Sequence, residues 1–78
     1  MHCTIYKSSK KDDTYLYLEK GADFSRVPES LLKLLGSLER VMDLELTPGR
    51  RLARADVEQV RAQLTSQGYY LQMPPQIY

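Results

Sequence analysis

Three tyrosine-containing runs with a two-residue alternation constrain the fold of this chain more than any other feature. The sequence has six tyrosines, one phenylalanine and no tryptophan, so its aromatic surface is almost entirely tyrosine. A tyrosine ring has a large apolar body and a polar tip, which suits strands with a half-exposed face. The chain is therefore expected to fold around a β-sheet. The tyrosines in these runs are Tyr6, Tyr15, Tyr17, Tyr69 and Tyr70.

The periodicity of apolar residues divides the chain into six elements. Alternation predicts strands at 2–7, 14–19, 38–46 and 69–73, and the polar segment 8–13 predicts a hairpin between the first two. Wider apolar stripes predict helices at 28–35 and 55–67, with Gly36 and Gly68 at their ends. The order β-β-α-β-α-β indicates an α+β two-layer sandwich with a mainly antiparallel four-stranded sheet and the helices packed on it.

Three local features refine this prediction. Phe24, the sole phenylalanine, is expected to fill the core beneath the first helix. Thr47-Pro48-Gly49-Arg50 predicts a turn, with a short extended stretch at 51–53. Arg54 stands where a capping side chain would be preferred, which leaves the start of the second helix undefined by a residue or two.

Length, charge and cysteine content exclude several classes of protein. A chain of 78 residues forms one small domain that buries about 60–65% of the surface of its unfolded chain. A net charge of +1 is too small for a broad basic surface that binds nucleic acid nonspecifically. Cys3 is the single cysteine, and no apolar run approaches the ~20 residues of a membrane span. A cytoplasmic protein without membrane attachment is expected, with one domain at 1–75 and a tail at 76–78.

The ionisable residues predict no catalytic site, metal site or cofactor. His2 and Cys3 are neighbours on a strand and point to opposite faces, so they do not form a dyad or share a metal ion. Asp12 with Asp13, and Asp43 with Glu45, are paired carboxylates that are expected to be solvated.

The tyrosines generate the sharpest functional hypothesis. If both helices cover the sheet face of Leu16, Leu18, Met42 and Leu44, the opposite face remains open. It would carry four tyrosines and a rim of three lysines, namely Tyr6, Tyr15, Tyr17, Tyr70, Lys7, Lys10 and Lys11. Such a face suits a protein partner, or single-stranded RNA whose bases stack on the rings. Alternatively, the tyrosines pair across strands and shield the sheet.

A second cluster of basic residues follows the third strand. It could contact nucleic acid or an acidic protein, or remain a solvated edge that pairs with Asp56 and Glu58. Its members are Arg50, Arg51, Arg54 and Arg61.

Four segments, in this order, resemble the YcgL-domain family of small bacterial proteins. They cover 5–10, 14–17, 23–29 and 68–75, with the sequences IYKSSK, TYLY, DFSRVPE and GYYLQMPP. The resemblance implies a compact α/β domain. Because the family has no established biochemical activity, it implies no catalytic or binding residue here. Arg54 replaces an expected asparagine at the second helix cap, and the chain ends at Tyr78 where many relatives continue with a polar tail.

These observations predict a bacterial, cytoplasmic, non-enzymatic domain that binds a protein through its tyrosine-bearing sheet face. RNA binding through the same face is the alternative. A homodimer that covers this face is compatible with both.

Overall fold

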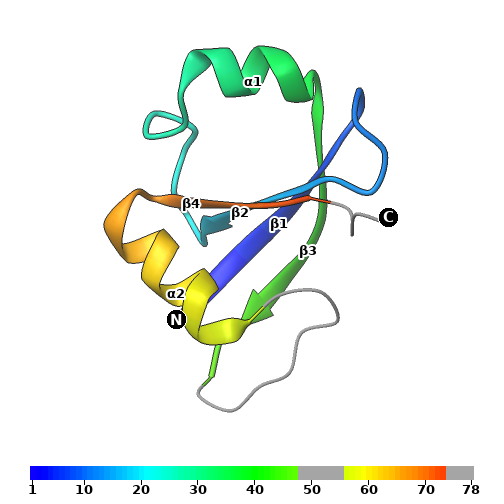
Figure 1. Cartoon of the computed structure of the whole chain (residues 1–78). Coiled ribbons are helices and arrows are strands. Elements are labelled where there is room, and N and C mark those ends of the chain that lie inside the picture. Colours follow the sequence, from blue (N-terminus) through cyan, green and yellow to red (C-terminus); the bar gives the residue numbers. More distant parts are fainter. Residues whose placement is uncertain (48–55, 74–78) are drawn as a thin grey trace, which may run out of the picture.

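The computed structural model describes residues 1–47 and 56–73 (Figure 1). The elements in this part of the chain are β1 (His2–Ser8), β2 (Tyr15–Glu19), α1 (Glu29–Leu35), β3 (Leu38–Glu45), α2 (Val57–Ser66) and β4 (Tyr69–Gln72). This arrangement confirms the α+β class and the order β-β-α-β-α-β.

The strands form one antiparallel sheet in the order β3-β1-β2-β4. The predicted hairpin joins the two central strands, β1 and β2. It closes with a hydrogen bond from the Ser8 N–H to the Thr14 carbonyl at 3.0 Å. The Ser8 hydroxyl donates to the Leu35 carbonyl at 2.6 Å, which fixes the hairpin to the end of α1. β3 and β4 are the two edges.

The two helices cover opposite faces of the sheet (Figure 1). On one face, Leu16 and Leu18 of β2 pack with Leu35 of α1, and Phe24 joins this cluster as predicted. On the other face, strand residues pack with Val60 and Leu64 of α2, namely Cys3, Ile5, Tyr17 and Leu44. The supposition that both helices lie on one face is therefore wrong. Both faces of the central strands are apolar, so each needs its own cover.

The register of the hairpin separates the tyrosines that were expected to share one face. Ile5 lies opposite Tyr17, whereas Tyr6 lies opposite Leu16. Directly opposite residues project to the same side of a sheet. Tyr6 therefore points toward α1, where its ring meets that of Phe24 edge-on at 5.1 Å between centroids. The open four-tyrosine face predicted from the sequence does not form, because its members lie on both covered faces.

The ends of α2 are defined by residues suited to them. Asp56 is the N-cap, and its Oδ1 accepts from the Glu58 N–H at 2.9 Å. The helix thus begins with a preferred capping residue two positions after Arg54, which lies outside the described residues. Gly68 has the predicted positive φ of 89° after the helix. The turn at 48–50, the stretch at 51–53 and the tail at 76–78 also lie outside the described residues.

Replacement of Leu16 by alanine should destabilise the fold strongly. Leu16 is fully buried between β2 and α1, so the truncation leaves a cavity that costs about 2–5 kcal/mol. The free energy of unfolding from urea denaturation measures this cost. Leu34→Ala is the matched control. Leu34 lies on α1 but is 50% exposed, so its truncation should lower the free energy of unfolding by about 0.5 kcal/mol or less. Equal losses for the two variants would contradict the burial of Leu16 beneath α1.

Candidate functional site

An apolar groove runs along the β4 edge of the sheet, between the two helices that cover its faces. The groove has a volume of about 640 Å³. α1 and the residue before it contribute Pro28, Ser30, Leu31 and Leu34, α2 and its C-terminal end contribute Gln63 and Gln67, and β4 contributes Tyr69, Tyr70 and Leu71. Its floor is thus an edge strand, and its two walls come from helices on opposite faces.

The chemistry of the groove is apolar and amide-based. Leu34 is half exposed beside Leu35, which is fully buried, so α1 turns one leucine to the sheet and another to the groove. The Gln67 side-chain amide donates to the Tyr69 carbonyl at 3.0 Å. The Tyr70 ring packs edge-on against the Tyr17 ring, with 5.5 Å between the ring centroids. None of the groove-lining residues given above is acidic or basic.

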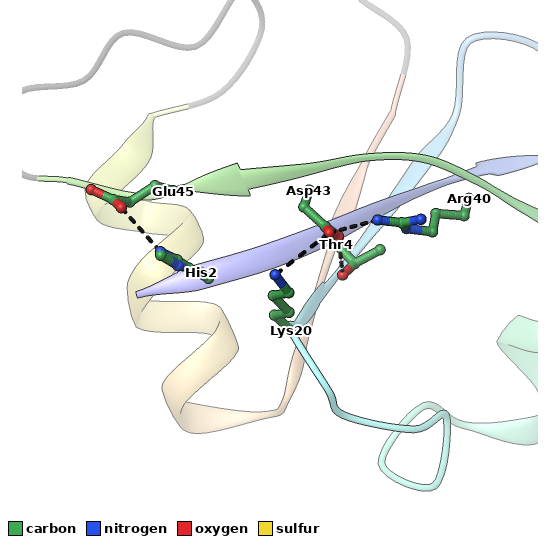
Figure 2. A network of polar contacts seen from close by, with 6 residues as sticks. All are labelled: His2, Thr4, Lys20, Arg40, Asp43 and Glu45. Atoms are coloured by element: carbon green, nitrogen blue, oxygen red, sulfur yellow. Dashed lines mark hydrogen bonds and ion pairs between the residues drawn. The ribbon is translucent and has the colours of Figure 1, made fainter.

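The opposite edge, β3, carries a β-bulge and a charged network. Met42 pairs with Ile5 and Arg40 pairs with Tyr6, so Val41 is the extra residue. The bulge brings Arg40 and Asp43 to the same face of the sheet, although residues three apart in a regular strand face opposite ways. Their side chains then form an ion pair, with 2.6 Å between Arg40 Nη2 and Asp43 Oδ2 (Figure 2).

Asp43 is the centre of this network (Figure 2). The Thr4 hydroxyl donates to Asp43 Oδ1 at 2.7 Å, and Lys20 Nζ lies 3.8 Å from Oδ2. The hydrogen bond from Thr4, followed by that from Arg40, lowers the pKa of the Asp43 carboxyl below its ordinary value. Both carboxylate oxygens are engaged, which makes Asp43 a structural anion that holds β3 to β1 rather than a general base.

The ionisable residues that were considered as pairs in the sequence either lie on opposite faces of the sheet or form hydrogen bonds and ion pairs with other residues. His2 is exposed and its Nε2 lies 3.0 Å from Glu45 Oε2, whereas Cys3 is buried in the core beneath α2. They project to opposite faces as expected. Across residues 1–47 and 56–73, no group of three or more His, Cys, Asp and Glu is arranged to hold a metal ion. In the same ranges, neither helix is long and apolar enough to cross a membrane.

The predicted binding residues do not assemble into one site. Lys7 is opposite Tyr15 and shares its face, but Lys10 lies in the hairpin turn, where its Nζ donates to the Lys33 carbonyl at 3.4 Å. Lys11 is exposed in the same turn. Of the basic cluster, Arg50, Arg51 and Arg54 lie outside the described residues, and Arg61 of α2 pairs with Glu58 at 3.4 Å.

Most of the residues that line the groove were not predicted from the sequence. Tyr70 was a candidate, but Leu31, Leu34, Gln63 and Gln67 were not. A signal was present in α1, which has four leucines among its seven residues. A seven-residue helix packs only one of its faces on the sheet, so its four leucines cannot all be buried there. At least one of them is expected to face away from the sheet core.

Asp43→Asn should destabilise the protein at about pH 7, and the difference from wild type should shrink in acid. The pKa of Asp43 is lower in the folded state than the usual value of about 3.9. Its stabilising contribution is therefore complete above that usual value and is lost as the pH falls through the lowered folded pKa. Urea denaturation from about pH 7 to about pH 2 measures the effect. The same comparison with Glu39→Gln, an exposed carboxylate of β3, serves as the control. A constant difference across this range would contradict the assignment.

Tyr17→Phe should remove both a buried hydrogen bond and a late tyrosine ionisation. The Tyr17 hydroxyl donates to Gln72 Oε1 at 2.6 Å, so its loss leaves a buried acceptor unpaired and costs about 1–3 kcal/mol. Burial raises the pKa of Tyr17, with smaller contributions from Cys3 and Tyr70. Alkaline titration of tyrosinate absorbance should show a late step that disappears in Tyr17→Phe and persists in Tyr6→Phe. Persistence of the late step in Tyr17→Phe would assign it to another tyrosine.

Comparison with known proteins identifies the family of this chain. The YcgL domain matches residues 3–75. The chain is 53% identical over 77 residues to the YcgL domain-containing protein PMI1171 of Proteus mirabilis (strain HI4320), with 99% of this chain and 79% of the relative covered. It is 56% identical over 75 residues to Protein YcgL of Escherichia coli (strain K12 / DH10B), with 96% and 69% covered. The same values hold for Protein YcgL of Shigella boydii serotype 18. The resemblance seen in the sequence is confirmed, and the chain belongs to the YcgL-domain family of small bacterial proteins.

Proposed function

We propose that this protein is a cytoplasmic, non-enzymatic interaction domain that binds a protein partner by adding a strand to the β4 edge. The observation that carries the proposal is the apolar groove along that edge. Strand addition combines main-chain hydrogen bonds at a sheet edge with side-chain contacts beside it. The β4 edge offers both features in one place.

The contrast between the two edges supports this choice. Proteins discourage unwanted strand pairing with bulges and charged side chains on edge strands. β3 has both, in the bulge at Val41 and in the charges of Glu39, Arg40, Asp43 and Glu45. β4 has the sequence Tyr-Tyr-Leu-Gln, with no charge and a regular register against β2. The edge without these protective features is the one beside the groove.

The walls of the groove provide contacts for alternating side chains. A strand added to β4 would project successive side chains to opposite faces of the sheet. Those on one face would meet Leu31 and Leu34 of α1, and those on the other would meet Gln63 of α2 and Gln67 at its end. An extended segment that alternates apolar and neutral polar residues fits this surface.

This proposal moves the partner-binding surface from the predicted tyrosine face to the sheet edge. Tyr70 remains part of it, whereas Tyr6 and Tyr17 belong to the packed faces. RNA binding, the alternative expectation, required stacked rings on one open face with lysines at the rim. The groove has no basic residue among those named above, so the geometry favours a protein partner.

Affinity capture from a lysate of the source bacterium tests the proposal. Leu34→Asp places a charge in the groove, and it should abolish capture of the specific partner because the carboxylate would be desolvated on binding. Val41→Asp is the matched control, since Val41 is also 50% exposed but lies on the opposite edge. Each bait is used before and after nuclease treatment.

The outcomes are distinct. Proteins that Val41→Asp retains and Leu34→Asp loses support a protein-binding groove. Capture that only nuclease removes would replace this proposal with nucleic-acid binding. Equal capture by all three baits would show that the groove is not the binding surface.

A further inference from the structure

We infer that the partner at the β4 edge is a second copy of this chain, paired antiparallel through β4 so that two four-stranded sheets become one continuous sheet. The inference rests on the proposed function, because it names the occupant of the same groove. β4 carries no charge and its register against β2 is regular, so a second β4 can pair with it without bringing like charges together.

Charge is the first argument for self-association at this edge. In two-fold antiparallel pairing, the residue on the axis meets its own copy, so a charged residue there would meet a like charge. β4 and the groove residues Leu31, Leu34, Gln63 and Gln67 are all uncharged. On β3, the bulge distorts the edge and four of its eight residues are charged, so a pairing strand would have to neutralise or desolvate these charges. Only β4 combines an electrically neutral edge with a regular register, among the two sheet edges described.

Symmetry is the second argument. In an antiparallel pair, directly opposite residues share a face, and a two-fold axis perpendicular to the sheet keeps each face on its own side. The axis would then pass beside Tyr70 or Leu71, which lie at the centre of the four-residue strand. Both copies of α1 would lie on one face of the joined sheet, and both copies of α2 on the other.

The exposed leucine of α1 gives the joined sheet a second contact. Leu34 is half exposed at the groove wall, on the same side of the sheet as Leu35 and the core beneath α1. With the two α1 helices on one face, Leu31 and Leu34 of each copy face the partner's α1 across the axis. The dimer would thus combine main-chain pairing between the β4 strands with apolar contact between the helices.

Sedimentation equilibrium of the purified 78-residue chain tests the inference. We expect wild type to be dimeric in the micromolar range. Leu34→Asp should raise the dissociation constant at least about tenfold, because two carboxylates would be brought together in an apolar contact. Val41→Asp, equally exposed on the other edge, should leave the constant unchanged. Far-ultraviolet circular dichroism of each variant checks that the fold is retained.

Hydrogen exchange of wild type gives a second measurement that needs no variant. If β4 is the interface, the amides of Tyr69–Gln72 should exchange more slowly as protein concentration rises, while those of β3 should not respond. A wild-type chain that stays monomeric near millimolar concentration would overturn the inference. So would a dimer that Leu34→Asp leaves intact or that Val41→Asp dissociates equally.

The results also separate this inference from the proposed function. A monomeric chain whose partner capture is still lost in Leu34→Asp would retain the β4 groove as a protein-binding site and exclude a second copy as its occupant. A monomeric chain with no groove-dependent capture would exclude both.

Discussion

The register of the β1–β2 hairpin is the constraint on which the rest of the structure depends. It places Ile5 opposite Tyr17 on one face and Tyr6 opposite Leu16 on the other. Both faces of the central strands then carry apolar side chains, and exposure of either face to water would be unfavourable. Each face must be covered, and the chain does this with one helix on each side (Figure 1). In the part of the chain that the structure describes, both faces of the central strands are thus covered, and the β3 and β4 edges lie at the surface.

The two edge strands differ in the features that discourage pairing with strands of other molecules. On β3, the bulge at Val41 brings Arg40 to the face of Asp43, and the resulting network also engages Thr4 (Figure 2). The Arg40 and Lys20 side chains are exposed, so their ion pairs with Asp43 add little to stability and mainly occupy the edge with charge. The hydrogen bond from Thr4 to Asp43 is the contact in this network that ties β3 to β1. The β4 edge has no such charges and lies beside the uncharged groove, whose walls are leucines of α1 and glutamines at the end of α2. Of the two sheet edges described, β4 is therefore the one without a bulge or charged residues.

Local features of the fold were predictable from the sequence, and relations between strands were not. Alternation and helix-ending glycines located all six elements to within a residue or two, because these signals reside in neighbouring residues. The pairing of Tyr6 with Leu16 depends on how the hairpin turn closes, and a shift of one residue would exchange the faces. The bulge at Val41 could not be predicted for the same reason. The residues of β3 alternate regularly in the sequence, and the extra residue is apparent only from their pairing with β1. Asp56 was a recognisable cap, yet the helix was expected to start at 55, two residues earlier than it does.

The small size of the domain explains why apolar residues remain exposed near the β4 edge. A domain of this length buries only about 60–65% of its unfolded surface, so apolar groups such as Leu34 remain partly exposed in the monomer. Leu34 and Leu35 are neighbours on α1, and Leu35 is already buried with Leu16 and Leu18, so α1 does not bury both leucines against the sheet. The proposed association at the β4 edge would remove Leu34 from water. It would also couple folding to binding, since whatever occupies the groove stabilises the folded chain by mass action.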